Sequence, residues 1–351
     1  MPIYPELAAV SAALDQAPEL YQPSVFWSEA SATIVRELET CGIERFRCLQ
    51  TPLSYFVPTW AVPVNGFTAE QGNALTGLLH TQFPDAVKAQ LALTQFLSGE
   101  MAAQADYRVL LAADDPARLP RLHTFSESQA GTPVGQQVFD GRKFSRSAMN
   151  YLLGLALLKK HLGADLPRVV LEIGGGFGTL GEVLAASGIP GWQYIDIDIP
   201  PTSFVAQWYL QQVLGEDQVT GWAATHEQKH LPIECLPAAS ALAAWQIEHL
   251  QGTVDLFVNF ISFQEMEPHI VRNYLAQAER LQTRWVLLRN LREGKPRLVP
   301  GLRHGVKEPV LGDDYLAMLP GYALVERSTL PFGYRTVDGF HSELLLLRRR
   351  D

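Results

Sequence analysis

A short apolar run that leads directly into glycines constrains the fold of this chain more than any other feature. Residues 168–173 are mostly β-branched or aliphatic, and Gly174, Gly175, Gly176 and Gly178 follow before an amphipathic stretch begins. Glycine lets the backbone approach a ligand closely and adopt positive φ, and a helix that starts after such a turn presents unpaired N–H groups. The pattern predicts a buried strand, a ligand-binding turn and a helix.

The rest of the C-terminal half alternates between strands and helices. Residues 192–197, 254–261 and 284–288 are apolar runs like the first one, and helical stretches separate them. Such alternation is typical of a parallel sheet. The last two runs, 322–326 and 340–348, are separated by turn residues without a helix, so we expect them to pair as an antiparallel hairpin. The sequence therefore predicts an α/β fold with a Rossmann-like, mostly parallel sheet that ends in an antiparallel hairpin.

The N-terminal third has a helical pattern. Apolar residues recur at helical spacing in two stretches, of which 73–97 is the longer. A long helix then begins near Ser145 or Ser147, either of which can cap it, and ends in a basic last turn. On this basis we divide the chain into a mainly helical cap region, residues 1–144, which helps to choose the substrate, and an α/β ligand-binding domain, residues 145–351.

The composition excludes several classes of protein. A formal net charge of −9 argues against a nucleic-acid partner, because binding phosphates requires a basic patch. The longest apolar run near the middle, residues 152–158, is far short of the ~20 residues that a bilayer span needs. The N-terminus has no basic stretch followed by an apolar core, so we expect no secretory signal, no membrane partner and a cytoplasmic location. The three cysteines are too scattered for a zinc site, and we predict no metal.

Two classes of ligand fit the glycine turn, and the register of the glycines separates them. Residues 176–181, Gly-Phe-Gly-Thr-Leu-Gly, match the motif of dinucleotide-binding turns, whereas residues 172–178, Glu-Ile-Gly-Gly-Gly-Phe-Gly, match the acidic-glycine motif of methyltransferases. In a dinucleotide motif the first glycine follows the strand immediately. Gly174 has that place, but Thr179 then stands where the third glycine is required. The register therefore favours S-adenosylmethionine over a nicotinamide dinucleotide as the cofactor.

Acidic residues near the ends of the first two strands support the same cofactor. Glu172 suits the cationic amino-acid end of S-adenosylmethionine, whereas it would repel a pyrophosphate. Asp196 and Asp198 lie about 25 positions further on, where a ribose-binding acid is expected. We choose Asp198, because Pro200 marks the end of the strand and alternation places both acids on one face.

Six short motifs carry a resemblance to a known family. They are Ser-Val-Phe-Trp at 24–27, Glu-Ser-Gln-Ala-Gly-Thr-Pro at 127–133, Ser-Ala-Met-Asn-Tyr at 147–151, Leu-Glu-Ile-Gly-Gly-Gly-Phe-Gly at 171–178, Asp-Ile-Pro at 198–200 and Ser-Phe-Gln-Glu-Met at 262–266. On these motifs, over most of its length, the chain resembles the sugar O-methyltransferase family within the class I S-adenosylmethionine-dependent methyltransferases. The resemblance implies that Glu172, Gly174, Gly176 and Gly178 cradle the methionine portion of the cofactor, with Asp198 on the ribose.

The chemistry is expected at the carboxyl edge of the sheet, just after residues 254–261, because ligands of open α/β folds bind there. We expect Asn259 to bind the cofactor together with Gly175 of the glycine turn. Methyl transfer is an in-line displacement, in which the enzyme aligns a nucleophile and accepts its proton. Glu265 and His269 follow the run directly and are the predicted catalytic residues.

The identity of the base stays open at this point. Plant small-molecule O-methyltransferases, which share the Asp-hydrophobic-Pro segment, have a catalytic histidine just after this strand, and Phe263 has that place here. His123 and Glu127 in the N-terminal region are alternative bases. Glu265 also has a purely structural interpretation, because acidic residues are favoured at helix N-termini.

Four polar residues are the predicted substrate ligands. Glu127 and Ser128 precede the long helix, Asn150 lies in its first turns, and Gln264 follows the run 254–261. The predicted function is transfer of a methyl group to a hydroxyl of a sugar or another polar small molecule, in natural product biosynthesis. Methylation of nitrogen, an NAD(P)-dependent dehydrogenase and a cofactor-binding subunit without catalysis are the alternatives. The expected partner is the small-molecule acceptor, and a homo-oligomer is left open.

Overall fold

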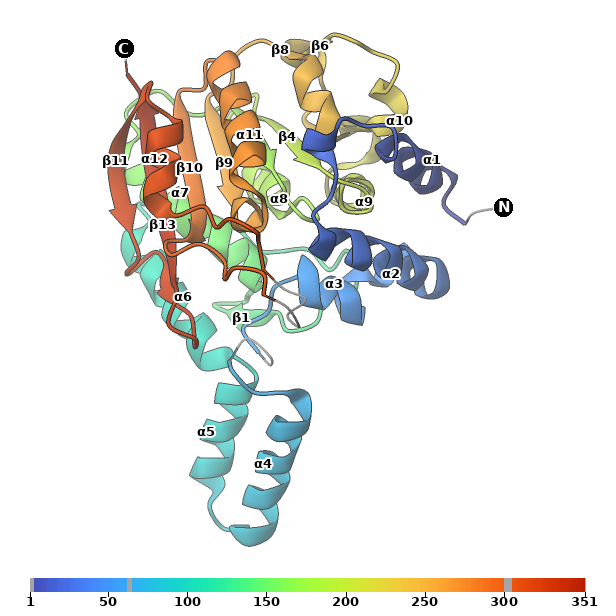
Figure 1. Cartoon of the computed structure of the whole chain (residues 1–351). Helices are drawn as coiled ribbons and strands as arrows, with labels where there is room; N and C mark the ends of the chain where they lie inside the picture. Colours follow the sequence, from blue (N-terminus) through green and yellow to red (C-terminus); the bar gives the residue numbers. More distant parts are fainter. Residues whose placement is uncertain (1–2, 62–64, 300–304, 351) are drawn as a thin grey trace.

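A nine-stranded sheet forms the centre of the molecule. The computed structural model describes residues 3–61, 65–299 and 305–350, and within them the strands follow the order β11-β13-β10-β9-β3-β4-β7-β5, with β12 paired to β13 (Figure 1). The strands of this sheet are β3 (Val169–Ile173), β4 (Gln193–Asp198), β5 (Val219–Gly221), β7 (Ala239–Ala243), β9 (Leu256–Phe260), β10 (Trp285–Leu291), β11 (Tyr322–Ser328), β12 (Tyr334–Arg335) and β13 (His341–Arg349).

The directions of the strands confirm the predicted fold class. From β10 to β5 every neighbouring pair is parallel. The last strand, β13, inserts between β10 and β11 and is antiparallel to both. The chain is therefore an α/β protein with a Rossmann-like, mostly parallel sheet and a reversed end, as the turn residues between the last two strands predicted.

Three strands of the sheet, β5, β7 and the two-residue β12, were not predicted from the sequence. β7 has the sequence Ala-Ser-Ala-Leu-Ala, and β5 is only three residues long. Alanine is depleted in strands in general, so the local signal for β7 is weak. All five residues of β7 are nevertheless buried, because the strand lies between β4 and β5 with helices over the sheet.

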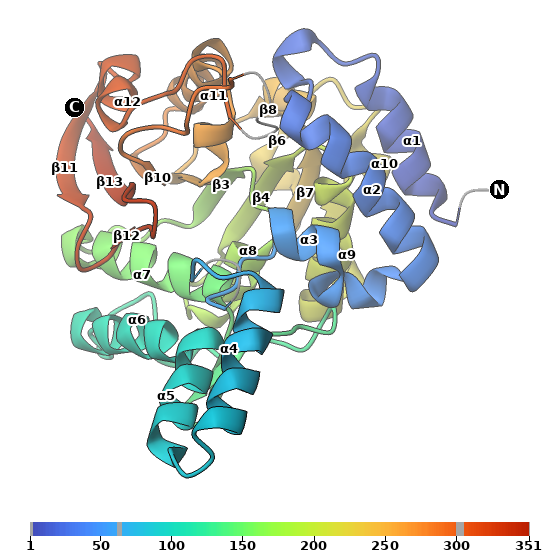
Figure 2. The same cartoon turned by 60° about the horizontal axis from the view of Figure 1, so that its bottom comes forward.

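Helices cover both faces of the sheet (Figure 2). One face carries α7 (Arg146–His161), α8 (Thr179–Ala186) and α9 (Thr202–Leu214), and the other carries α11 (Pro268–Arg280) and α12 (Gly312–Met318). The long helix α7 is the one predicted near residue 145, and the Ser145 side chain caps it by accepting a hydrogen bond from the Ala148 N–H at 3.2 Å. The remaining helix of the C-terminal half is the short α10 (Trp222–Thr225).

The first 144 residues are mainly helical and share their buried clusters with the sheet domain. Their helices are α1 (Pro5–Leu14), α2 (Val25–Cys41), α3 (Gln50–Tyr55), α4 (Ala69–Gln82), α5 (Val87–Leu97) and α6 (Glu100–Ala113), followed by a small hairpin, β1 (Gln137–Phe139) and β2 (Arg142–Phe144). Ile34 and Leu38 of α2 pack in one cluster with Phe177 and Val205, and Leu110 of α6 belongs to the cluster under α7. The division at residue 144 stays a prediction.

Short 3-10 helices and a small two-stranded sheet connect the main elements. The 3-10 helices are η1 (Glu19–Tyr21), η2 (Ile43–Cys48), η3 (Glu216–Gln218), η4 (Ile233–Cys235), η5 (Ala244–His249) and η6 (Ser262–Glu265). Strands β6 (Leu231–Pro232) and β8 (Leu250–Gln251) pair beside the main sheet. None of the helices in the described ranges is both long enough and apolar enough to cross a bilayer.

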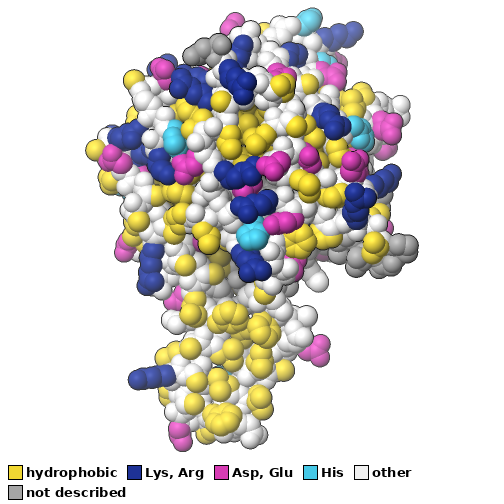
Figure 3. All heavy atoms as spheres, turned by 60° about the vertical axis from the view of Figure 1, so that its left-hand side comes forward, with side chains coloured by type: hydrophobic (Ala, Val, Ile, Leu, Met, Phe, Trp, Pro, Cys, Tyr) yellow, Lys and Arg dark blue, Asp and Glu magenta, His cyan; other side chains and the backbone are white. Residues whose placement is uncertain are grey.

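The hairpin of α4 and α5 projects from the body of the molecule and is apolar on its surface (Figures 1 and 3). Its large exposed side chains include Leu78 (55% exposed), Phe83 (58%), Val87 (58%) and Leu91 (59%). Apolar surface gathered in this way is typical of a contact with another molecule. The structure identifies no such molecule, so the homo-oligomer stays an open prediction.

Candidate functional site

A cavity of about 610 Å³ lies at the carboxyl edge of the parallel strands. The chain runs from β3 to β4 on one side and later returns to β9 on the other side of β3, so this edge is the topological switch point of the sheet. Its floor is formed by the glycine turn and by the ends of β4 and β9. Its other walls come from η1, α2 and α3 of the N-terminal region, from the start of α7 and from the start of α11.

The glycine turn between β3 and α8 disfavours side chains, through positive φ at Gly174 and Gly176 and through lack of space at Gly174 and Gly175. Gly174 and Gly176 have φ of +69° and +66°, a region that residues with a Cβ rarely adopt. At Gly174 a Cβ would also lie 2.3 Å from the Ser262 Oγ. At Gly175 it would lie 2.5 Å from the Asp196 Oδ1 and 2.6 Å from the Tyr194 hydroxyl. The backbone of this turn is therefore open to a ligand on the cavity side, where Gly174, Gly175 and Gly176 all line the wall.

The fourth predicted glycine has a packing position instead. Gly178 has φ of +85° and begins α8, and a Cβ there would lie 3.0 Å from Leu210 of α9. Gly178 allows the close contact between α8 and α9, and this contact requires a glycine. The residue is not among those that line the cavity.

Asp198 ends β4 and its carboxylate lines the cavity. The main-chain N–H of Gly176 donates to its Oδ2 at 3.2 Å, and that of Ile199 donates to its Oδ1 at 2.7 Å. Burial raises the pKa of Asp198, and the charge of Glu265 acts in the same direction. Each carboxylate oxygen has two lone pairs, so Asp198 is held in place and can still accept hydrogen bonds from a ligand.

Two further acids lie one layer below the cavity wall. Asp196 is fully buried and accepts a hydrogen bond from the Gly175 N–H at 3.1 Å. Glu172 is also fully buried, and the Tyr194 hydroxyl donates to its Oε2 at 2.7 Å. Burial raises the pKa of Glu172 to about 8. Direct contact of Glu172 with a ligand was expected, but its side chain is buried under the turn, because residue 172 lies inside β3, before the strand ends at the glycines.

Asn259, a predicted cofactor ligand, is committed to main-chain and side-chain partners at the end of β9. Its amide nitrogen donates to the Ile173 carbonyl at 2.9 Å and to the Ser262 Oγ at 2.5 Å, while its oxygen accepts from the Phe263 N–H at 3.2 Å. Next to it, Ile261 has φ of +74°, a strained conformation for a β-branched residue. Asn259 thus fixes the sharp turn that brings the following segment to the cavity.

The segment after this turn carries both predicted catalytic residues to the cavity wall. The Glu265 carboxylate forms an ion pair with the Lys295 Nζ at 2.7 Å and accepts a hydrogen bond from the Trp27 Nε1 at 2.9 Å. His269 is exposed at the start of α11 and has no side-chain partner among the residues that the structure describes. Phe263, expected from the resemblance to stand where plant O-methyltransferases have a histidine, is buried in a cluster of rings with Tyr274.

Of the four predicted substrate ligands, one lines the cavity. Asn150 stands on its wall, and within the described residues its side-chain amide has no hydrogen-bond partner. Gln264 turns away from the cavity, because its Oε1 accepts a hydrogen bond from the Leu291 N–H at 2.8 Å. Glu127 and Ser128 were expected to contact the substrate, and the structure instead places them in a buried polar cluster on the other side of α7's first turn.

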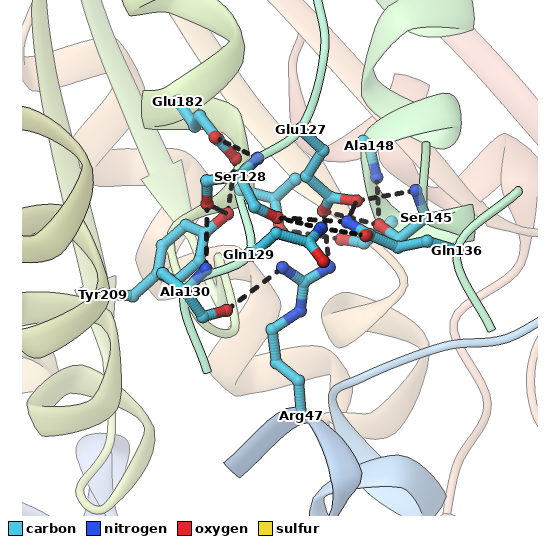
Figure 4. Close-up of polar contacts among 12 residues, drawn as sticks. Arg47, Glu127, Ser128, Gln129, Ala130, Gln136, Ser145, Ala148, Glu182 and Tyr209 are labelled. Carbon is cyan, nitrogen blue, oxygen red and sulfur yellow. Dashed lines mark hydrogen bonds and ion pairs between the residues drawn. The ribbon is translucent and has the colours of Figure 1, made fainter. Parts of the chain in front are cut away.

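That cluster joins the N-terminal region to the sheet domain, and we name it the Arg47–Glu127 cluster (Figure 4). Arg47 reaches from η2 to the Glu127 carboxylate, with 2.7 Å between the Nη2 and the Oε1. Ser145 donates to Glu127 through both its N–H and its hydroxyl, each at 2.7 Å, and Gln136 donates through its Nε2 at 2.7 Å. Removing one partner of such a buried pair leaves an uncompensated charge, which is strongly destabilising. Through Ser145, Glu127 therefore connects the N-terminal region to the start of α7.

Glu182 of α8 extends the same cluster. Its Oε1 accepts a hydrogen bond from the Ser128 N–H at 2.8 Å, and the Tyr209 hydroxyl donates to its Oε2. Burial, followed by repulsion from Glu127, raises the pKa of Glu182 to about 7. Glu182 thus links the N-terminal region, through Ser128, to the helix that begins at the glycine turn.

The raised pKa of Glu182 predicts how stability depends on pH. The folded state binds more protons than the unfolded state between the ordinary pKa of 4.5 and about 7, so the free energy of unfolding falls as pH rises through this window. We expect the free energy of unfolding of Glu182→Gln to fall by up to about 3 kcal/mol less than that of the wild type as pH rises through this window. Urea unfolding at pH 5 and pH 8 measures it, with Glu216→Gln, on exposed η3, as the control. Equal pH dependence in wild type and Glu182→Gln would contradict the assignment.

Several cavity residues were not predicted as site residues from the sequence, although Ser24 and Trp27 belong to one of the motifs quoted above. The ring of Tyr55 and the indole of Trp27 form part of the wall, and Trp27 meets Glu265 although 238 positions separate them. Buried hydroxyls of Ser24 and Thr202 also line the cavity and have no hydrogen-bond partner among the described residues. Contacts over such sequence distances leave no local pattern. No group of three or more metal-ligating side chains is found in the described part of the chain.

Comparisons with known proteins give similar folds at low identity. No family model matches the chain, and a search of curated proteins finds no match. The magnesium protoporphyrin IX methyltransferase of Synechocystis PCC 6803, solved with bound S-adenosylhomocysteine, is 16% identical, with a TM-score of 0.39 over 58% of this chain and 84% of that one. The mitomycin 7-O-methyltransferase is 12% identical, with a TM-score of 0.37 over 98% of this chain and 72% of that one.

A third similar structure is an N-methyltransferase. The 1,6-didemethyltoxoflavin N1-methyltransferase of Burkholderia thailandensis is 17% identical, with a TM-score of 0.39 over 57% of this chain and 79% of that one. Likeness at these values does not assign the chain to a family. The resemblance to sugar O-methyltransferases stays a prediction, and the function has to be argued from the site.

Proposed function

We propose that this protein is an S-adenosylmethionine-dependent methyltransferase that methylates a hydroxyl of a polar small molecule, such as a sugar. The observation that carries the proposal is the turn Gly174–Gly176, which lacks side chains and faces the cavity beside the Asp198 carboxylate. Asp198 would accept hydrogen bonds from the two ribose hydroxyls, and the turn would hold the methionine portion. The unpartnered hydroxyls of Ser24 and Thr202 offer further polar contacts in the same cavity.

The charge around the turn supports a cationic cofactor. Asp196 is buried beside the half-buried Asp198, repulsion between their charges raises the pKa of Asp196 further, and the buried Glu172 also acts on Asp196 in this direction. A positive ligand at the turn would relieve this repulsion, whereas a pyrophosphate would add to it. S-adenosylmethionine supplies a sulfonium methyl group that is already electrophilic. The residues of this chain therefore need to bind the cofactor, orient the acceptor and take up the acceptor's proton.

We assign the proton acceptor to His269 and a positioning role to Glu265. His269 lines the cavity without a side-chain partner among the described residues, whereas the Glu265 carboxylate is held between Lys295 and Trp27. Each oxygen of the Glu265 carboxylate already accepts a hydrogen bond from one of these two partners. In this arrangement Glu265 fixes Trp27 of the N-terminal wall against the acceptor side of the cavity.

Titration calorimetry with S-adenosylhomocysteine, and separately with NAD and NADP, tests the cofactor. Binding of S-adenosylhomocysteine alone is the expected result, and binding of a nicotinamide dinucleotide instead would overturn the proposal. A screen of sugars and amines then identifies the acceptor. With a hydroxyl acceptor, we expect His269→Gln to lower kcat by about 10²- to 10⁴-fold, and Glu265→Gln to lower it less. His80→Gln on the projecting hairpin is the control; the reverse order of the first two variants would assign the base to Glu265.

A further inference from the structure

Two arginines stand directly behind one wall of the cavity. That wall consists of Thr59, Asn150 and Phe260. Arg289, from the end of β10, is fully buried behind it, with its guanidinium carbon 5.3 Å from the centre of the Phe260 ring. Its Nη2 lies 3.5 Å from the Asn150 carbonyl oxygen and donates to the Phe332 carbonyl at 2.8 Å.

The charge of Arg289 is poorly compensated. The Nε and Nη1 of its guanidinium are buried and have no hydrogen-bond partner among the described residues. Burial lowers the pKa of Arg289 to about 10, so the side chain remains charged at neutral pH. A buried cation without a hydrogen-bonded counter-ion is costly, and a buried group with a shifted pKa beside a cavity is a candidate for a functional site.

A second positive charge lies next to it. Arg146, the first residue of α7, is half-buried; its Nη1 donates to the Thr59 carbonyl at 2.9 Å, and its guanidinium lies 4.8 Å from the Tyr334 ring centre. The charge of Arg146 contributes to the lowered pKa of Arg289, so the two cations repel each other. The acid that acts on both is Asp106, which accepts a hydrogen bond from Trp60 and whose pKa burial raises.

The positive and negative ends of the cavity are well separated. Arg289 lies on β10 and Asp198 on β4, with β9 and β3 between them, which corresponds to three strand spacings or about 14 Å. The cofactor proposed above would lie at the acidic end. An acceptor that binds between the cofactor and the wall at Asn150 would then have the end that is remote from the cofactor near the two arginines.

We propose that the acceptor carries an anionic oxyacid group, a carboxylate or a phosphate. This group binds against the wall at Asn150 and Thr59, and Arg146 and Arg289 lie directly behind that wall. The proposal rests on the methyltransferase function for the direction of the acceptor, but the anion site itself is independent of the cofactor. Asn150 supplies an amide without another partner in the described residues, and the two positive charges directly behind the wall favour an anion there.

Calorimetric titration of the full chain with inorganic phosphate, and separately with benzoate, tests the site at constant ionic strength. We expect millimolar or tighter binding of at least one probe, weakened about tenfold or more in Arg146→Met and largely kept in Arg146→Lys. Lys307→Met, which changes an exposed cation on the same cavity, is the matched control. Tighter binding of phosphate indicates a phosphate group on the acceptor, and tighter binding of benzoate indicates a carboxylate.

The outcomes distinguish this proposal from the cofactor assignment. Absence of binding for both probes, or equal affinity in wild type and Arg146→Met, would overturn the anion site. Each variant is also titrated with S-adenosylhomocysteine, whose binding Arg146→Met should leave unchanged. Failure of the wild type to bind S-adenosylhomocysteine overturns the proposed function, whereas loss of anion binding alone overturns only the acceptor class.

Discussion

Asp198→Asn should weaken the binding of S-adenosylhomocysteine by about 10- to 100-fold, because a hydrogen bond to a charged group contributes about 1.5–3 kcal/mol. The amide keeps the shape of the side chain and one acceptor oxygen. It loses the negative charge and one acceptor oxygen. The variant side chain therefore cannot accept hydrogen bonds from two vicinal hydroxyls in addition to those from the Gly176 and Ile199 N–H groups. Titration calorimetry at pH 8, where the carboxylate of the wild type is more fully ionised, measures the difference.

Asp196→Asn is the matched control for this experiment. Asp196 belongs to the same strand and the same acidic cluster, but it lies below the turn and bonds to the Gly175 N–H. An asparagine oxygen can accept the same hydrogen bond, and loss of the charge relieves repulsion, so we expect binding within a few-fold of wild type. Equal losses in the two variants would show that charge in the cluster, and not contact at Asp198, controls affinity.

Gly175→Ala should abolish S-adenosylhomocysteine binding and lower the free energy of unfolding by about 1–3 kcal/mol, the range for overpacking of a filled interior. The added Cβ would lie 2.5 Å from the Asp196 Oδ1, 2.6 Å from the Tyr194 hydroxyl and 2.8 Å from the Glu172 Oε2. These groups bond to one another and to the turn, so they can move only if the turn itself shifts. Urea unfolding and calorimetry measure the two effects.

Gly163→Ala provides the control for this substitution. A Cβ at Gly163, in the connection after α7, would meet no atom within 4 Å, so we expect unchanged binding and a stability within about 0.5 kcal/mol of wild type. If Gly175→Ala were as stable as Gly163→Ala and still bound S-adenosylhomocysteine, the turn would not be the close-contact site that we infer.

The sheet and the glycine turn could be predicted because their signals are local. The strand β3, the turn and the start of α8 lie within one continuous stretch, so their pattern is complete in the sequence. Asp198 could be placed beside the turn for a similar reason, since neighbouring parallel strands end at one edge of the sheet. The strand β7 was missed because its alanines become a good strand only when both faces are covered.

Whether a side chain reaches the cavity or lies below its wall could not be predicted from local sequence patterns. Alternation along a strand places Asp196 and Asp198 on one face, but only Asp198 reaches the cavity. Glu172 likewise has the right sequence position for a cofactor ligand and lies beneath the turn. Which residue of a polar pair meets a ligand depends on where the strand ends relative to the helices above it.

The sequence by itself determined the fold class and the glycine turn with its acidic partner, because each follows from residues within one strand, one turn or two neighbouring strands. The tertiary structure decided which polar side chains face the cavity. Glu127 pairs with Arg47 at a separation of 80 positions, and Glu265 meets Trp27 at a separation of 238. Buried polar groups must find partners within the folded chain, and the partner that is nearest in space is fixed only when the distant segments pack together.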